Sequence, residues 1–346
     1  MFGKNLKYYR LKRNMTKKDL AEAVGLTPMA ITNYESDYRK PSFDIVVKIA
    51  KALNVDIKDF ITVQSKELSF EHEEFRKTSK LTQTKQEFIR EAVEEYFGRF
   101  FNAIDCLGRK VLPDPIESHK LTVTKDVEKD ALELRKALDF PTSGPIINLI
   151  THLEYMGIFI LFLNIDNESF SGMNGRVENY SYIVVNSNHS AERIRSTVAH
   201  ELAHIMFKNI GKEKEQELYA TAISGAFLLP RRDLIIKLGL KRNKITKDLE
   251  IICKEYGVSS QMLMKRAEVN GIISSSQLRD FFISITRLGW RKKEPSRINR
   301  EEPLLFKELV FRGINEGEIN IDKGAELLKI THDELNKYCG LWEDFQ

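Results

Sequence analysis

Cysteine and long apolar runs are both scarce in this chain. Its three cysteines, Cys106, Cys253 and Cys339, are far apart and odd in number, which argues against a disulfide framework and favours a reducing compartment. The longest apolar run, residues 157–163, has the length of a strand, whereas a membrane span needs roughly 20 residues. With 42% hydrophobic and 30% charged residues, we expect a soluble cytoplasmic protein of two or three domains with no membrane partner.

Net charge is small as well. A formal charge of +4 over 346 residues excludes a polycation that binds nucleic acid along its whole surface. Residues 1–62, however, carry 12 basic and seven acidic side chains, so this segment alone has a charge of +5. Any surface that binds nucleic acid is therefore expected within this segment.

Residues 1–62 also carry the boundary signals of several short helices. Thr16 is placed to cap a helix that stops at Gly25, and Pro28 stands at the first position of the next helix. Two helices joined by a short glycine turn form the helix-turn-helix unit, whose second helix enters the DNA major groove. The pattern from Leu20 to Glu35 closely resembles the XRE (Cro/C1-type) family, which implies a five-helix domain with double-stranded DNA as its partner.

In such a domain the second helix of the unit reads the bases while basic residues around it contact phosphates. The residues expected at base edges are Thr27, Met29, Thr32 and Asn33. The residues expected at phosphates are Lys17, Arg39 and Lys40. A palindromic operator has two half-sites, so we expect a homodimer if the operator is of that kind. The alternative is a helical domain that docks a protein, because a fold alone does not fix a function.

Two of the seven histidines lie four residues apart, in His200-Glu201-Leu202-Ala203-His204. On a helix such residues stand about one turn apart on the same face, so that their imidazoles can hold one Zn²⁺. The glutamate beside the first histidine is then placed to act on water as a general base. The spacing therefore predicts a catalytic metal site with Glu201 as the base.

A catalytic zinc takes a third protein ligand. Glu217, in a second predicted helix after Gly211, is a candidate, but Glu213 and Glu215 compete with it on spacing alone. The second helix also has three residues spaced to pack closely on the histidine helix: Leu218, Ala222 and Gly225.

The whole block resembles the ImmA/IrrE metallopeptidases, in which His-Glu-x-x-His is followed by Glu-x-x-Ala-x-x-x-Ala-x-x-Leu-Leu-x-Pro. The matching residues are Glu217, Ala220, Leu228, Leu229 and Pro230, with Ser224 in place of an alanine. The resemblance implies that Glu217 is the third ligand in a zinc endopeptidase, although an open site of this kind would also accept Mn²⁺. It also implies that the substrate is an XRE-type repressor, whose cleavage derepresses stress or mobile-element genes.

The remaining chain completes an α+β, mostly helical fold. A long amphipathic helix is predicted from about Thr84 to Cys106, and strands at residues 158–163 and 182–185 flank a polar region with Gly172. Residues 321–330 have helix-turn-helix character again. The expected domains are a five-helix DNA-binding domain (1–62), a linker with a long helix (63–110), a zincin-like metallopeptidase domain with a small antiparallel sheet (111–273) and a helical C-terminal region (274–346).

The sequence leaves several assignments open. The group that would stabilise an oxyanion has three candidates, Tyr219, Arg195 or a histidine, and the sequence alone does not distinguish them. Three further polar residues are more often packing groups than partners of metal ligands: His152, Glu154 and His189. Two alternative functions are a transcriptional regulator whose metal site is a sensor with little or no proteolysis, and a toxin–antitoxin or phage-type module that binds a partner protein. Self-cleavage within residues 62–85 is a further hypothesis.

Overall fold

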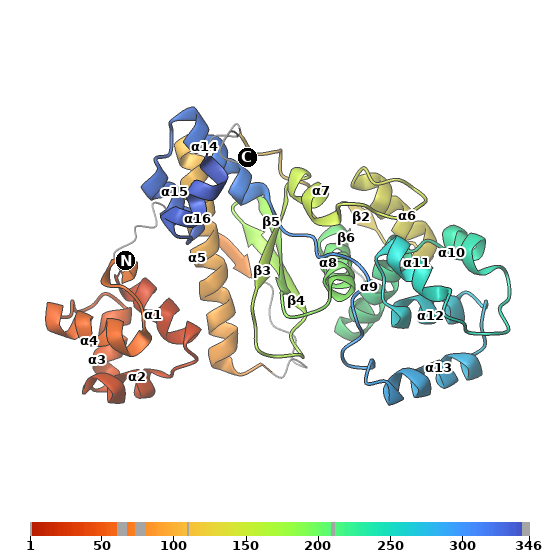
Figure 1. Cartoon of the computed structure of the whole chain (residues 1–346), viewed down its shortest axis with the longest axis horizontal. Helices are drawn as coiled ribbons and strands as arrows, with labels where there is room; N and C mark the ends of the chain where they lie inside the picture. Colours follow the sequence, from red (N-terminus) through yellow and green to blue (C-terminus); the bar gives the residue numbers. More distant parts are fainter. Residues whose placement is uncertain (1, 61–67, 73–80, 109–110, 209–211, 341–346) are drawn as a thin grey trace. The chain divides into compact units, whose positions relative to one another are not determined.

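The computed structural model describes residues 2–60, 68–72, 81–108, 111–208 and 212–340. Of the predicted linker and long helix (63–110), residues 63–67, 73–80 and 109–110 lie outside the described residues. The chain divides into two compact units, of which the first combines residues 1–112 with residues 306–346 and the second spans residues 113–305 (Figure 1). The predicted fold class, α+β and mostly helical with a small sheet, is confirmed.

The first unit begins with the predicted bundle of short helices. It consists of α1 (Phe2–Lys12), α2 (Lys17–Val24), α3 (Pro28–Glu35), α4 (Phe43–Leu53) and a 3₁₀ turn η1 (Ile57–Phe60). The hydroxyl of Thr16 accepts a hydrogen bond from the backbone N–H of Asp19, and Gly25 ends α2 in the left-handed conformation that glycine adopts without steric cost. The fifth helix is only a single 3₁₀ turn, which suffices to bury Phe60 against the rings of Phe2 and Tyr9.

Four further helices complete the first unit. The long helix α5 (Gln83–Leu107) contacts α1, and a short strand β1 (Phe70–His72) precedes it. The C-terminal helices are α14 (Leu305–Glu316), α15 (Ile321–Leu328) and α16 (His332–Cys339). The Arg99 guanidinium of α5 donates to the carbonyl oxygen of Leu327, so a cation caps the negative end of the α15 dipole.

Helices α15 and α16 repeat the local layout of α2 and α3. Both pairs consist of two eight-residue helices separated by three residues, which include a left-handed C-cap (Gly25 or Lys329) and a threonine N-cap. The helix-turn-helix character predicted for this region is therefore confirmed in its backbone. The first turn of α16, however, carries Asp333 and Glu334, and carboxylates there would repel DNA phosphates.

The second unit is built on a sheet in which β5 (Tyr180–Asn186) lies between β4 (Gly172–Val177) and β3 (Ile158–Leu163). Strands β4 and β5 are antiparallel neighbours, whereas β3 pairs with β5 in parallel, with Ile160 opposite Ile183. The sheet is therefore mixed, and the prediction of a purely antiparallel sheet was wrong for β3. The three strands alternate in direction along the chain, so β3 and β5 run the same way. Because β3 lies beside β5 and not beside β4, its pairing is parallel.

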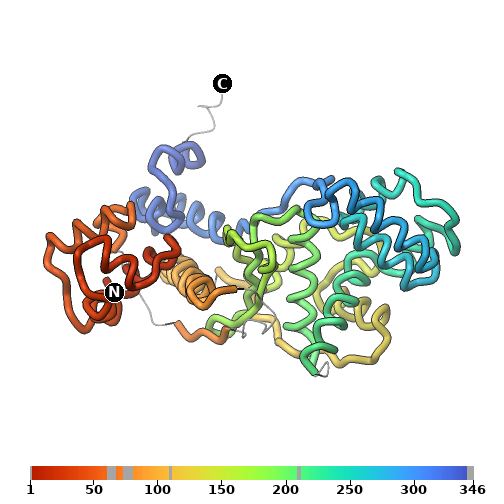
Figure 2. Tube along the Cα trace, turned by 90° about the horizontal axis from the view of Figure 1, so that it is seen from below, coloured from red at the N-terminus to blue at the C-terminus, as the bar shows by residue number. Residues whose placement is uncertain are grey.

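Helix α8 (Ala191–Met206) packs on one face of this sheet, and α9 (Glu213–Leu228) lies beside it in both views (Figures 1 and 2). Ile160 and Ile183 from the sheet share a hydrophobic core with Val198 and Leu202 of α8. The second unit has six further helices, of which α6 and α12 contact α9: α6 (Val127–Ala137), α7 (Leu149–Tyr155), α10 (Arg231–Leu238), α11 (Leu249–Tyr256), α12 (Ser260–Val269) and α13 (Ser275–Arg287). A two-residue parallel pair joins β2 (Leu121–Thr122) to β6 (Phe207–Lys208).

None of the helices in the described parts of the chain combines the length and the apolar character needed to cross a bilayer.

Candidate metal centre

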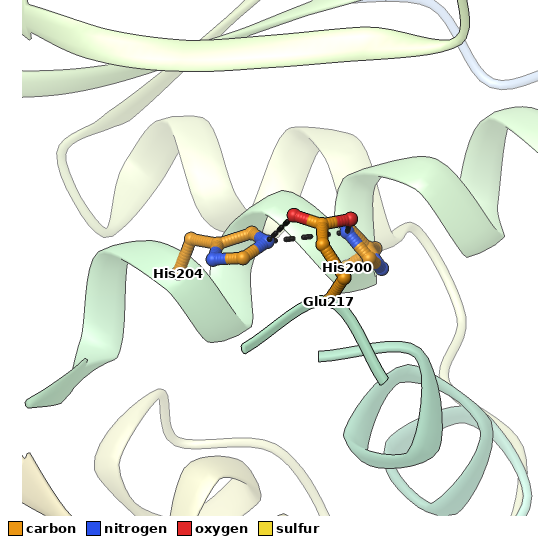
Figure 3. Close-up of side chains that lie close together, drawn as sticks. All are labelled: His200, His204 and Glu217. Atoms are coloured by element: carbon orange, nitrogen blue, oxygen red, sulfur yellow. Dashed lines mark hydrogen bonds and ion pairs between the residues drawn. The ribbon is translucent and has the colours of Figure 1, made fainter. Parts of the chain in front are cut away.

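Helices α8 and α9 bring three potential metal ligands together. The Nε2 atoms of His200 and His204, one turn apart on α8, lie 3.2 Å from each other. The carboxylate of Glu217, in the first turns of α9, places Oε2 3.5 Å from His200 Nε2 and Oε1 3.3 Å from His204 Nε2 (Figure 3). All three side chains are partly accessible, so the centre can be reached from solvent.

The spacing of these atoms fits a small tetrahedral cation. Two ligand atoms at 2.0–2.1 Å from such a cation stand about 3.3 Å apart, which agrees with the 3.2 Å between the two Nε2 atoms. Each histidine nitrogen has a different Glu217 oxygen near it, and one ligand atom from each of the three residues lies within 4.8 Å of the others. Two imidazole nitrogens and one carboxylate oxygen leave one of four coordination positions for water or substrate. The donor set therefore has the composition of an open metal site and not of a closed one with four protein ligands.

The other two acidic candidates on α9 do not join this group. Glu215 accepts a hydrogen bond from the backbone N–H of Lys212 at 3.2 Å and so caps its own helix. Glu213 is exposed in the same first turn, where a carboxylate also favours the helix dipole. Glu217 is the acid that faces the histidines.

Two further side chains contact the histidine motif, and the sequence did not reveal either contact. The Thr221 hydroxyl lies 3.3 Å from His200 Nδ1, so α9 supplies both a ligand and a group that orients the other nitrogen of a ligand. Asn174 on β4 donates from Nδ2 to Glu201 Oε2 at 3.0 Å. Both Asn174 and Glu201 are buried, with 8% and 3% of their surfaces exposed.

The two named candidates for stabilising an oxyanion have other partners. The Tyr219 hydroxyl donates to the Asp130 carboxylate, and burial together with this carboxylate raises the pKa of Tyr219. Arg195 is buried, pairs with Glu301 and donates to the carbonyl oxygen of Ile146 at 2.7 Å. Tyr219 and Arg195 therefore hold the surrounding helices in place.

The remaining polar candidates also make packing contacts. His152 lies 2.7 Å from the carbonyl oxygen of Leu138, and its ring contacts Phe140. Glu154 accepts a hydrogen bond from the backbone N–H of Leu304 at 2.8 Å. The remaining histidine of this group, His189, lies 3.0 Å from the carbonyl oxygen of Phe170. These contacts agree with the packing role expected for such residues.

Two buried arginines anchor the C-terminal end of α9. Arg135 of α6 donates from Nε to the carbonyl oxygen of Phe227 at 2.7 Å, and Arg266 of α12 donates from Nη2 to that of Leu229 at 3.0 Å. Burial lowers the pKa of Arg135 to about 10, so it remains a cation at neutral pH. Both guanidinium groups neutralise the negative end of the α9 dipole and so fix the helix that carries Glu217.

The packing predicted for α9 was wrong in part. Leu218 is 66% exposed, because a residue next to Glu217 points about 100° away from the histidines. Gly225 is buried, but the side chain of Arg266 packs closely on it. Ala220, Ile223 and Phe227 supply the buried face instead.

The predicted DNA contacts occupy α3 and its surroundings. Thr27 is the N-cap of α3, and Met29, 67% exposed, shares a helix face with Thr32 and Asn33, opposite the buried Ile31 and Tyr34. Three basic residues were expected at phosphates. Arg39 and Lys40 are exposed after α3, whereas Lys17 is half-buried, with its Nζ 3.8 Å from a carboxylate oxygen of Glu35.

Two protein families match separate parts of this chain. A helix-turn-helix family matches residues 6–60, and an IrrE N-terminal-like domain, from a metallopeptidase-like family, matches residues 153–268. No solved structure matches the chain.

Three curated relatives are helix-turn-helix-type transcriptional regulators. YqaE of Bacillus subtilis, described as uncharacterized, is 32% identical over 73 residues, which cover 21% of this chain and 63% of YqaE. ImmR of the same organism is 34% identical over 100 residues, or 29% of this chain and 74% of ImmR. MJ0272 of Methanocaldococcus jannaschii, also described as uncharacterized, is 37% identical over 62 residues, or 18% of this chain and 94% of that protein. The chain thus spans less than two thirds of the length of YqaE.

Proposed function

The chain belongs to the helix-turn-helix family through residues 6–60 and carries an IrrE N-terminal-like domain over residues 153–268, and from these two parts we propose a DNA-binding regulator with metal-dependent endopeptidase activity. The observation that supports the activity most directly is the convergence of His200, His204 and Glu217 to within 3.5 Å of one another. Glu201, between the two histidines in sequence, supplies the general base that a purely structural site does not need.

In this proposal His200, His204 and Glu217 hold Zn²⁺, and Mn²⁺ is an alternative occupant. When bound, the cation lowers the pKa of water and polarises the scissile carbonyl. The Glu201 carboxylate takes the proton from the attacking water and later delivers it to the leaving amine. Thr221 keeps the His200 ring in place by its contact with Nδ1, which favours Nε2 as the ligating atom.

The proposed substrate is an XRE-type transcriptional repressor. Two observations support this choice: the family resemblance of the His-Glu-x-x-His block, and the presence in the same chain of a domain similar to the regulators ImmR and YqaE. A chain that occupies the same operators as its substrate, as a homodimer on palindromic DNA, would meet that repressor at a high local concentration. Cleavage would then derepress the genes under its control in the cytoplasm.

Cleavage of candidate repressors tests the activity. Purified XRE-type repressors are incubated with the wild-type chain or with Glu201→Gln, each with Zn²⁺, Mn²⁺ or a chelator. We expect the wild type to cut one of them in the presence of metal and Glu201→Gln to leave it intact. The matched control is Glu213→Gln, which changes an exposed glutamate at the start of α9 and should cut like the wild type.

The alternative function is a regulator whose metal centre acts as a sensor. The same experiment separates the two, because a sensor binds metal stoichiometrically and retards operator DNA but leaves every repressor intact. A metal-dependent change in DNA affinity that is lost in His204→Ala would then assign the centre to sensing.

A further inference from the structure

Strand β4 runs alongside α8 with alternate residues facing the helix. At Gly172 the approach is so close that a Cβ atom would lie 2.6 Å from the Thr197 Cγ2 atom of α8. Asn174 lies two residues after Gly172 on β4, and Glu201 lies four residues after Thr197 on α8. The side chain of Asn174 donates a hydrogen bond to that of Glu201. Two residues of a strand advance about 6.7 Å and four residues of a helix about 6.0 Å, so the two elements stay in step. The glycine therefore leaves room for β4 to lie close to α8 near the point where Asn174 meets the helix.

The contact between Asn174 and Glu201 is buried and directional. Only 8% of Asn174 and 3% of Glu201 is exposed. The Nδ2–Oε2 distance is 3.0 Å, and an ionised carboxylate accepts hydrogen bonds but donates none, so the amide must present its NH₂ group. A glutamate side chain has three rotatable bonds, whose freedom this hydrogen bond restricts. Burial also makes the orientation more costly to change than it would be on the surface.

We infer that Asn174 is a positioning residue that holds the Glu201 carboxylate in the orientation from which it acts on water. This inference rests on the proposed function and names the residue that supports its general base. A general base contributes roughly 10²- to 10⁴-fold to a rate, and outer partners of metal-site groups roughly 10- to 100-fold. Asn174 acts through Glu201 and is not itself expected to touch substrate.

The kinetic test uses two changes at Asn174 in the metal-loaded full chain. Asn174→Asp keeps the size of the side chain but replaces the donor by an oxygen that faces the carboxylate of Glu201. Asn174→Ala removes both the donor and the bulk. We expect each to lower kcat for repressor cleavage by about 10- to 100-fold, with KM and metal stoichiometry unchanged.

The matched control makes the same change at another buried asparagine of this sheet. Asn186 of β5 is 1% exposed, and its Nδ2 donates to the carbonyl oxygens of Ile165 at 2.9 Å and Phe170 at 3.1 Å. Asn186→Asp should lower the melting temperature but leave kcat per folded, metal-loaded molecule unchanged. A structural role for Asn174 would instead make the two Asp variants behave alike.

The second readout does not depend on activity. Crystal structures of the wild type and of Asn174→Ala are compared at Glu201, and the proposal expects its side chain to leave the wild-type rotamer or to occupy several. An unmoved Glu201 overturns the inference whatever the kinetics. If the wild type cuts no repressor, the proposed function fails, and the Glu201 rotamer still decides the role of Asn174.

Discussion

Arg10 and Glu35 form a two-point ion pair inside the helix-turn-helix domain. Nε and Nη2 of Arg10 lie 2.5 and 3.0 Å from the two carboxylate oxygens of Glu35, and the side chains are only 3% and 4% exposed. The pair joins α1 to the C-terminal end of α3, the helix proposed to read DNA.

Removing one member of this pair should destabilise the domain. Glu35→Ala leaves a buried guanidinium without its carboxylate, which costs about 3–5 kcal/mol. Calorimetry of the full chain should show a lower melting temperature for the helix-turn-helix domain. Lys17→Ala serves as the control, because its ammonium is 3.8 Å from the same carboxylate and its side chain is 42% exposed, so its loss should cost less than about 1 kcal/mol. A Glu35→Ala protein that melts like Lys17→Ala would contradict this reading.

Mutations of the residues proposed at phosphates and of those proposed at bases should change different properties of DNA binding. Arg39→Ala and Lys40→Ala should each reduce the slope of log affinity against log salt by about 0.9, because one fewer counterion is released. Met29→Ala or Asn33→Ala should instead weaken binding by about 1–3 kcal/mol and reduce the preference for one base at a single operator position. Quantitative DNA retardation over a series of salt concentrations and operator variants measures both. Arg232→Ala, in an exposed position of α10, should alter neither quantity.

Metal binding should stabilise the folded second unit through His200, His204 and Glu217. A cation at 100 times its Kd adds about 2.7 kcal/mol if it binds only the folded chain. The melting temperature of the wild type should therefore rise with Zn²⁺ and fall back with a chelator. His204→Ala should not respond, whereas Glu213→Gln should respond like the wild type. A Zn²⁺-dependent rise that persists in His204→Ala would place the metal elsewhere.

Stability should decrease in mildly acidic solution because of His189. Burial and the nearby Arg193 hold the pKa of His189 below its ordinary value of 6.5. The neutral ring is thus favoured in the folded state, and its contribution to stability is complete above about pH 6.5. That contribution is lost as the pH falls from there towards the folded pKa, where the ring of the folded protein also protonates.

Melting temperatures between pH 7.5 and pH 5 test this behaviour. The wild type should lose more stability over this range than His189→Gln, which does not titrate. His332→Gln is the control, because its side chain is 57% exposed. Parallel curves for the wild type and His189→Gln would show that His189 is not responsible.

Local signals in the sequence predicted most of the secondary structure around the site. Thr16, Gly25 and Thr27 act through residues within one helical turn, so their capping roles follow from the sequence alone. The one-turn spacing of His200 and His204 is equally local. Glu217 comes from a different helix, and only the family resemblance favoured it over Glu213 and Glu215.

Contacts between distant segments were not predictable in the same way. The hydrogen bond from Asn174 to Glu201 joins a strand to a helix, and nothing in the polar sequence around Gly172 indicates which residue will face α8. The parallel pairing of β3 with β5 arises because β3 lies at the edge of the sheet beside β5 and not beside β4. The sequence of a strand does not indicate which neighbour it will pair with. The exposure of Leu218 followed from the rotation of α9 that directs Glu217 to the histidines.

The contacts of α9 determine how this unit can be excised for study. Residues 153–268 cover the family match, but a fragment cut at those limits would lack Arg135, which caps the end of α9, and Asp130, which holds Tyr219. It would also lack Glu301, the partner of Arg195 on the histidine helix. A fragment of residues 113–305, the bounds of the compact second unit, keeps all three anchors. If a 153–268 fragment is inactive, the loss of these three contacts explains it, and the result says nothing about the chemistry of the intact chain.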